Sequence, residues 1–299
     1  MKKIISYSLY GNDPKYSVGM IVNAFLAKEI YDGWVCRVYY DDTAPYSAIE
    51  VLKTFDNVEL VEMSSDIAVK VNEKMLWRFL PASDDNVDIM ISRDADSWLS
   101  HRERVCVDAF ENSNKTFHII RDHCYHGMKI MGGMWGCKKG TVENIEKMIK
   151  DWKESNQSYD QAFLAKNLYP ENLETLMVHH GEQYDFRGRR VYGYQMTDDS
   201  HTTRLYEVGI EEGYINDGGV MIPEYDPSLE SVAIKDNNGN ELTRFSFAYA
   251  NRLNEFHCAH CGKVHDTFIG GIITNQPPNV IDFLRNYITE KGLSTEGLF

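Results

Sequence analysis

Apolar segments of strand length alternate with segments of helical periodicity over roughly the first 95 residues, and this alternation limits the possible fold more than any other feature. The predicted strands cover residues 3–10, 33–40, 57–63 and 87–92. After the first strand, apolar residues recur at the i, i+3, i+4, i+7 spacing of one helix face, at Val18, Ile21, Val22 and Phe25. Strands joined by helices in this way predict a wound, mostly parallel α/β sheet that is flanked by helices.

The same pattern continues less regularly through the middle of the chain. Further helices are predicted at residues 46–55, 71–82, 100–112, 141–154 and 159–170. Ser100 and Thr141 are the expected caps of two of them. Further strands are predicted at residues 115–122 and 173–180, and the glycine-rich segment 132–140 is a strand or a loop. The pattern weakens from about residue 185. We therefore expect one domain over residues 1–200 and a less regular C-terminal extension over residues 201–299, packed on it.

Charge and apolar content narrow the class of protein. The net charge of -14 argues against binding to nucleic acid or a membrane surface, which both require a basic surface. No apolar run approaches the roughly 20 residues of a membrane helix, and the first apolar run ends at Gly11, too early for a signal peptide. Six cysteines in 299 residues do not indicate a disulfide framework. We expect a soluble, cytoplasmic protein without membrane insertion.

Two aspartates, Asp94 and Asp96, directly follow the fourth predicted strand. In a wound sheet, ligands bind outside the carboxyl ends of the strands, where Ser8 and Asp41 are also expected. Two carboxylates spaced i, i+2 can share one hard cation such as Mg²⁺ or Mn²⁺. Such an ion stabilises the negative charge that develops when a diphosphate departs. The alternative is a solvated loop whose aspartates precede a helix.

The segment RDADSWLSHRE (93–103) resembles part of the nucleotide-sugar-dependent glycosyltransferases of the GT-A fold. More narrowly, it resembles a set of viral and bacterial proteins that share this D-x-D-containing block. The likeness extends to the segments SLYGNDPKYSVG (8–19), MLWRFLP (75–81), FHIIRD (117–122), GGMWGCKKG (132–140), YDQAFL (159–164) and MVHH (177–180). The resemblance implies that residues 1–200 form a GT-A-type catalytic domain that binds a nucleotide-diphosphate sugar and Mn²⁺ or Mg²⁺.

The resemblance also implies roles for single residues. Asp94 and Asp96 would hold the metal ion, with Asp96 as the direct ligand and Asp94 nearer the ribose or sugar of the donor. The end of the first strand would contact the nucleotide through Ser8, Leu9, Tyr10 and Tyr16. Ordinary loop and core packing is the alternative for these four residues.

Two arginines near the aspartates are candidate contacts of the diphosphate or sugar. Arg78 lies in a predicted helix among apolar neighbours, and Arg93 directly precedes Asp94. A guanidinium group pairs with phosphate through two parallel hydrogen bonds, which suits both residues to this role. A structural ion pair with a nearby carboxylate is the alternative for each of them.

A carboxylate and a histidine further along the chain complete the predicted site. Asp160 resembles the acceptor-side aspartate of such enzymes, where it would accept the proton of the attacking hydroxyl or bind sugar hydroxyls. Its alternative role is to complement a helix dipole. The resemblance also implies a histidine as third metal ligand, and we favour His180 over His179. Only one of the two is expected to face the site, because adjacent strand residues point in opposite directions.

A cysteine pair near the C-terminus indicates a second possible metal. Cys258 and Cys261 have C-x2-C spacing, and His265 follows closely. Thiolate and imidazole are ligands of structural Zn²⁺, but a closed site requires four ligands and these residues provide three. The alternative is a pair of reduced thiols on a turn.

Together these features predict a metal-dependent glycosyltransferase that moves a sugar from a nucleotide-diphosphate sugar to a hydroxyl of a glycan or glycoprotein acceptor. Two alternatives stay open at the level of sequence. One is a metal-dependent nucleotidyltransferase, which also uses aspartate-bound metal to handle a diphosphate. The other is a non-catalytic domain that binds a sugar or a protein.

Overall fold

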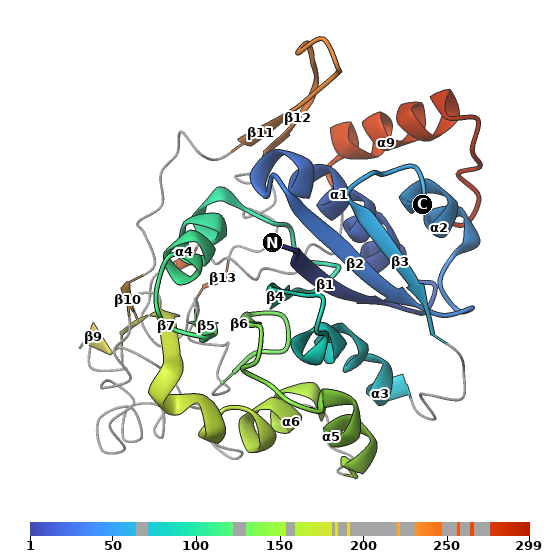
Figure 1. Cartoon of the computed structure of the whole chain (residues 1–299). Helices are drawn as coiled ribbons and strands as arrows, with labels where there is room; N and C mark the ends of the chain where they lie inside the picture. The colour runs from blue at the N-terminus through green and yellow to red at the C-terminus, as the bar shows by residue number, and fades with distance from the viewer. Residues whose placement is uncertain are drawn as a thin grey trace.

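The computed structural model places most of the N-terminal 180 residues and several segments after them (Figure 1). The described residues are 1–63, 71–121, 130–153, 159–180, 183–184, 190–191, 220–221, 231–246, 256–257, 264–265 and 276–299. Within these residues no helix is both long and apolar enough to cross a membrane.

The core of the protein is an eight-stranded sheet with the order β10-β7-β5-β6-β4-β1-β2-β3. Its strands are β1 (Lys3–Leu9), β2 (Trp34–Tyr40), β3 (Val58–Glu62), β4 (Ile89–Ser92), β5 (Phe117–Arg121), β6 (Trp135–Lys138), β7 (Leu176–His180) and β10 (Val220–Met221). Only β6 runs antiparallel to its neighbours, β4 and β5, and the other pairs are parallel. The predicted wound, mostly parallel α/β sheet is therefore confirmed.

Helices cover both faces of this sheet (Figure 1). The α-helices are α1 (Pro14–Ile30), α2 (Tyr46–Leu52), α3 (Val71–Lys74), α4 (His101–Glu111), α5 (Ile145–Asp151), α6 (Tyr159–Asn167) and α9 (Pro278–Glu290). Two 3₁₀ helices, η1 (Trp77–Ser83) and η2 (Pro170–Thr175), connect elements. One apolar cluster joins the sheet to α1, α2, α4 and α9, and a second joins it to η1, α5 and α6.

Helix α1 is buried on almost all sides, and the C-terminal part of the chain contributes to this burial. The helix begins after Asp13, whose carboxylate accepts a hydrogen bond from the backbone N–H of Lys15, with Pro14 at the first helical position. Beside it lie α9 and the hairpin of β11 (Ser231–Lys235) and β12 (Glu241–Ser246) (Figure 1). Because α1 is apolar all round, it requires this cover. Residues on both sides of the proposed boundary at residue 200 therefore share one hydrophobic core.

Two predictions of local structure differ from the observed elements. The segment 71–82 contains only the short α3, followed by the 3₁₀ helix η1, which includes Pro81. Pro81 cannot donate the backbone hydrogen bond that would continue an α-helix at its own position. Thr141 does not cap α5, which begins at Ile145, and its hydroxyl instead donates to the carbonyl of Thr116 at 3.1 Å. The predicted cap Ser100 is confirmed, since its Oγ accepts from the N–H of Glu103 at 3.2 Å.

Candidate functional site at the carboxyl ends of β1 and β4

Asp94 and Asp96 lie directly beyond the carboxyl end of β4, as the sequence predicts. Strand β4 is parallel to β1, and Ser92 is opposite Ser6 in the register. The two aspartates differ in environment. The side chain of Asp94 is 42% exposed, whereas that of Asp96 is 7% exposed. The pair thus combines one solvent-facing carboxylate with one that is almost buried.

Burial changes the acid–base behaviour of Asp96. Loss of hydration, together with the negative charge of Asp94, raises the pKa of this carboxyl to about 6. Lys15, at the first turn of α1, opposes this effect, with its Nζ 3.8 Å from Asp96 Oδ2. The Lys15 ammonium also lies 4.5 Å from the ring centroid of Tyr16. A bound divalent cation would favour the ionised form of Asp96 far more strongly than this lysine does.

Arg78 connects the two acidic parts of the site. Its guanidinium pairs with Asp94 through Nη1 and donates to Asp160 Oδ2 through Nη2 at 2.8 Å. The backbone N–H of Arg78 donates to Ser8 Oγ at 3.1 Å, which ties η1 to the end of β1. Burial alone would lower the pKa of Arg78, but Asp94 and Asp160 raise it above its usual value. Arg78 therefore remains a cation in the interior.

Asp160 begins α6 and is itself 7% exposed. Its Oδ2 accepts from Arg78, and its Oδ1 accepts from the backbone N–H of Gln161 at 2.8 Å. The carboxylate therefore lies beside the D-x-D segment and acts there as a partner of a guanidinium group. Its predicted role as catalytic base stays a prediction.

Two glycines allow these carboxylates to approach the chain between β5 and β6. A Cβ on Gly132 would lie 2.0 Å from Asp160 Oδ2, and a Cβ on Gly133 would lie 2.1 Å from Asp94 Oδ2. The carbonyl of Gly132 also accepts a hydrogen bond from Ser92 Oγ at 2.8 Å. Any side chain at either glycine would displace a carboxylate of the site.

The end of β1 leads into a second polar cluster at the same edge of the sheet. Tyr10 packs edge-on against Trp77 with ring centroids 6.1 Å apart, and burial raises its pKa to about 12. Lys74 lies 5.8 Å from the Tyr10 ring centroid and pairs with Asp41 at 2.5 Å. Tyr10 therefore stays protonated and uncharged, and the charge of Lys74 is paired with that of Asp41. At this edge of the sheet the Tyr10 ring thus lies beside an ion pair.

Arg93 does not belong to the candidate site. Its Nε donates to Glu103 Oε1 at 2.6 Å, and both side chains are at most 3% exposed. The Arg93 Nη1 donates to the carbonyl of Ser92 at 2.7 Å, and Tyr31 also donates to Glu103 Oε1 at 2.7 Å. The structural ion pair, which was the alternative for this residue, is therefore observed. Through Nε, the Arg93 guanidinium links the start of the D-x-D segment to Glu103 of α4, while its buried Nη2 has no hydrogen-bond partner among the described residues.

Some of the remaining predicted residues are buried away from the site, and others lie outside the described part of the chain. Leu9 is 1% exposed and belongs to the apolar core, while Tyr16 is partly buried beside Lys15. His179 is buried, and its Nδ1 lies 2.8 Å from Nε2 of His118. His180 ends β7 opposite Arg121, and its side chain lies outside what the structure describes. Cys258, Cys261 and the side chain of His265 also lie outside the described part, so the zinc prediction stays untested.

Three residues of this region are absent from the sequence-based prediction. Lys15 lies beside Asp96, Lys74 lies one turn before Arg78, and Asn23 contacts the backbone after Asp94. A sequence signal exists for Asn23, since an amide in the middle of an otherwise apolar helix requires a buried partner. The position of Lys15 just after the turn that follows β1 is a weaker signal.

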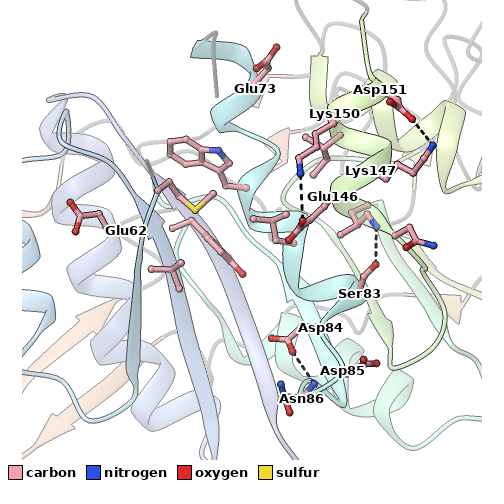
Figure 2. A pocket seen from close by; sticks show the side chains of 18 of the residues that line it. Glu62, Glu73, Ser83, Asp84, Asp85, Asn86, Glu146, Lys147, Lys150 and Asp151 are labelled. Carbon is pink, nitrogen blue, oxygen red and sulfur yellow. Dashed lines mark hydrogen bonds and ion pairs between the residues drawn. The ribbon is translucent and has the colours of Figure 1, made fainter. Parts of the chain in front are cut away.

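A groove of about 1400 Å³ lies apart from this site, between β3, η1 and α5 (Figure 2). Two of the three lysines that line it pair with acids of α5: Lys147 with Asp151 at 2.8 Å, and Lys150 with Glu146 at 3.8 Å. The third, Lys153, donates to the carbonyl of Lys150 at 2.8 Å. Trp77 contributes to the groove but is only 3% exposed. None of the three site aspartates lines the groove.

The donor set of the site suits a hard divalent cation. Among the described residues no group of three or more His, Cys, Asp and Glu could hold a metal ion by itself. Mg²⁺ and Mn²⁺ do not need such a group, because they bind through one or two carboxylates together with water and substrate phosphates. Asp94 and Asp96 would offer such an ion carboxylate oxygens of different exposure, and Lys15 and Arg78 place two positive charges beside them.

Comparisons with known proteins give similarities only at the level of structure. No family model matches the chain, and no curated protein matches it. Similar solved structures include the galactosyltransferase LgtC in complex with donor and acceptor sugar analogs, at 11% identity and a TM-score of 0.41, over 60% of this chain and 73% of that chain. Another is the mannosyltransferase PcManGT from Pyrobaculum calidifontis in complex with GDP-Man and Mn²⁺, at 9% identity and 0.40, over 66% and 55%.

A third similar structure is a 4-diphosphocytidyl-2C-methyl-D-erythritol synthase from Anaerococcus prevotii, at 11% identity and a TM-score of 0.40, over 73% of this chain and 96% of that chain. At such identities and scores, these proteins share with this chain at most the general arrangement of a wound α/β sheet.

Proposed function

We propose that this protein is a metal-dependent glycosyltransferase that moves a sugar from a nucleotide-diphosphate sugar to an acceptor hydroxyl of a glycan or glycoprotein. The observation that carries the proposal is the meeting of Asp94 and Asp96 with Arg78 and Lys15 at the carboxyl ends of β1 and β4. A site with two carboxylates and two basic side chains suits a divalent cation together with an anionic diphosphate. In the proposal, residues 1–200 form the catalytic domain and residues 201–299 the extension packed on it.

The proposed roles follow from the position of each residue, except the role of His180, which rests on the sequence resemblance alone. Asp94 and Asp96 hold Mn²⁺ or Mg²⁺, and His180 is the proposed third ligand. Ser8 and Tyr10 face the nucleotide at the end of β1. When bound, the ion neutralises charge that develops on the departing diphosphate.

Arg78 and Lys15 contribute fixed positive charge to the same diphosphate. Arg78 is oriented by Asp94 and Asp160, and a phosphate oxygen would replace one of these carboxylates as its partner. Asp160 stays the proposed carboxylate on the acceptor side. In the reaction, the bond between the anomeric carbon and the β-phosphate oxygen breaks, and a bond from that carbon to the acceptor oxygen forms. The acceptor proton passes to a base, for which we propose Asp160.

Product analysis tests this proposal. The purified chain is incubated with a panel of nucleotide sugars and Mn²⁺, and release of free nucleoside diphosphate is measured with and without EDTA. We expect metal-dependent release from one or two donors. We also expect Asp94→Asn to lower the rate by about 100-fold or more, because metal-assisted charge stabilisation contributes several kcal/mol. Asp85→Asn, which changes an exposed carboxylate on the rim of the separate groove, should leave the rate unchanged.

Two outcomes would contradict the proposal. Release of pyrophosphate from a nucleoside triphosphate, with no turnover of nucleotide sugars, would indicate nucleotidyl transfer instead. Absence of turnover and of any metal-dependent binding of nucleoside diphosphates would indicate a non-catalytic domain.

A further inference from the structure

Asn23 is a fully buried amide in the middle of α1, and its side chain forms hydrogen bonds with the segment that carries the two aspartates. Its Nδ2 donates to the carbonyl of Ala95 at 3.3 Å and to the carbonyl of Ser97 at 2.9 Å. Its Oδ1 accepts from the backbone N–H of Leu99 at 3.0 Å. The two carbonyls that it holds belong to Ala95 and Ser97, the residues directly before and after Asp96.

The backbone of α1 approaches this segment so closely that no side chain fits between them. A Cβ on Gly19, one turn before Asn23, would lie 2.3 Å from the carbonyl oxygen of Ala95. On the same segment, the Trp98 ring packs against Phe245 of β12 with centroids 5.7 Å apart. The segment after Asp94 is therefore held between α1 and the C-terminal hairpin.

Core packing alone does not explain an asparagine at this position. An apolar residue would fit an otherwise apolar helix better, since burying an amide costs free energy unless its hydrogen bonds are made. Replacing Asn23 by an apolar residue would, however, leave two carbonyls and one N–H of the segment without this partner. Asn23 thus satisfies irregular backbone that a strand or helix would satisfy by itself.

We propose that Asn23 is a positioning residue of the D-x-D segment, which fixes the separation and direction of the Asp94 and Asp96 carboxylates. This inference rests on the proposed function in so far as those carboxylates hold the metal ion. Asn23 contacts neither the metal nor the donor and acts through the backbone on both sides of Asp96. Residues that orient metal ligands in this way affect metal affinity by roughly 10–100-fold.

The first test measures Mn²⁺ binding to the full chain by titration calorimetry, with Mn²⁺ alone as the probe. We expect Asn23→Ala to weaken Mn²⁺ binding by roughly 10–100-fold. The matched control is Asn57→Ala, since Asn57 Nδ2 also donates to a backbone carbonyl of α1, that of Ala24, at 2.9 Å. The control should leave Mn²⁺ affinity unchanged. A folded Asn23→Ala variant with wild-type Mn²⁺ affinity would overturn the inference.

A second measurement does not depend on metal binding. Hydrogen exchange followed by mass spectrometry reports the protection of residues 94–100 in the metal-free chain. We expect Asn23→Ala to lose protection selectively in this segment, at the Leu99 amide above all, while Asn57→Ala does not. If Asn23→Ala does not fold, Asn23→Ser, which keeps a shorter hydrogen-bonding group, takes its place in both measurements and should show the same losses in smaller degree.

The two measurements separate this inference from the proposed function. If the wild-type chain does not bind Mn²⁺, the proposed metal site fails, and the exchange of residues 94–100 then decides alone whether Asn23 positions the segment. Unchanged protection of the segment in a folded variant would overturn the inference in that case.

Discussion

Asp96→Asn is expected to make the metal-free protein more stable by about 2–3 kcal/mol at pH 8 and to abolish metal-assisted donor binding. The gain in stability follows from the pKa of Asp96, which burial and the charge of Asp94 raise to about 6. At pH 8 the folded chain must keep this carboxylate ionised in an environment that disfavours the charge. Asparagine removes that cost and also removes the proposed metal ligand.

The two pKa values of Asp96, in the unfolded and the folded chain, determine how the stability of the protein changes with pH. An unfolded chain loses the Asp96 proton near pH 4, whereas the folded chain loses it near pH 6, so the folded state binds more protons between these values. The contribution of Asp96 to stability is therefore fully present below about pH 4 and is lost as the pH rises through 6. The stability difference between Asp96→Asn and wild type should grow over this window and then stay constant.

Urea denaturation in EDTA at pH 4, 5, 6, 7 and 8 measures this difference. Asp94→Asn is the matched control, because it removes a counter-charge of the buried Arg78 and should not stabilise the protein. A stability difference that is equal at all five pH values would contradict the assigned environment of Asp96. Equal stability of Asp96→Asn and wild type at pH 8 would contradict it as well.

Phe245→Ala is expected to destabilise the protein by about 3–5 kcal/mol, the range for a fully buried phenylalanine. Phe245 lies on β12 in the C-terminal extension, yet it is 0% exposed. Its ring centroid lies 6.4 Å from that of Phe25 on α1, 5.7 Å from that of Trp98 and 5.9 Å from that of Phe283 on α9. Truncation of this ring would leave a cavity between α1, the D-x-D segment and α9.

Leu242→Ala provides the control for this variant. Leu242 lies on the same strand but is 55% exposed, so its removal should change stability by less than about 0.5 kcal/mol. Denaturant unfolding of both variants, followed by tryptophan fluorescence, measures the effects. If Phe245→Ala were as mild as Leu242→Ala, the hairpin would not be part of the N-terminal core, and the extension would be a separate unit.

The architecture could be predicted because its signals are local. Strand β4 is a continuous apolar run up to its final serine, which is the pattern of a strand covered on both faces. The apolar periodicity at the start of α1 and the turn before it gave the first crossover. The carboxyl end of β4 then placed Asp94 and Asp96 at the edge of the sheet where ligands bind.

The parts of the site that could not be predicted depend on contacts between distant residues. Asn23 bonds to residues 72 to 76 positions further along the chain, and Lys15 meets Asp96 because α1 packs against the segment that follows β4. For Arg93, the sequence alone allowed both a phosphate contact and an ion pair. The packing of α4 decided between them by placing Glu103 beside the guanidinium.

At residues 71–82, beside the site, the observed structure also differs from the α-helix that the sequence predicts. The apolar spacing of residues 71–82 is helical, but 3₁₀ hydrogen bonds such as that from the N–H of Phe79 to the carbonyl of Leu76 at 2.9 Å replace the expected α-helix. This tighter winding sends neighbouring side chains to different partners, with Trp77 against Tyr10 and Arg78 against Asp94. Pro81 is the only local signal for it.

The most direct test of the central claim is a crystal of the chain soaked with Mn²⁺ and a nucleoside diphosphate, with data collected at the manganese absorption edge. The account predicts an anomalous peak in contact with carboxylate oxygens of Asp94 and Asp96, with the diphosphate bridging that ion and the Arg78 or Lys15 side chain. A diphosphate bound elsewhere in the molecule, or a manganese peak away from both aspartates, would contradict it.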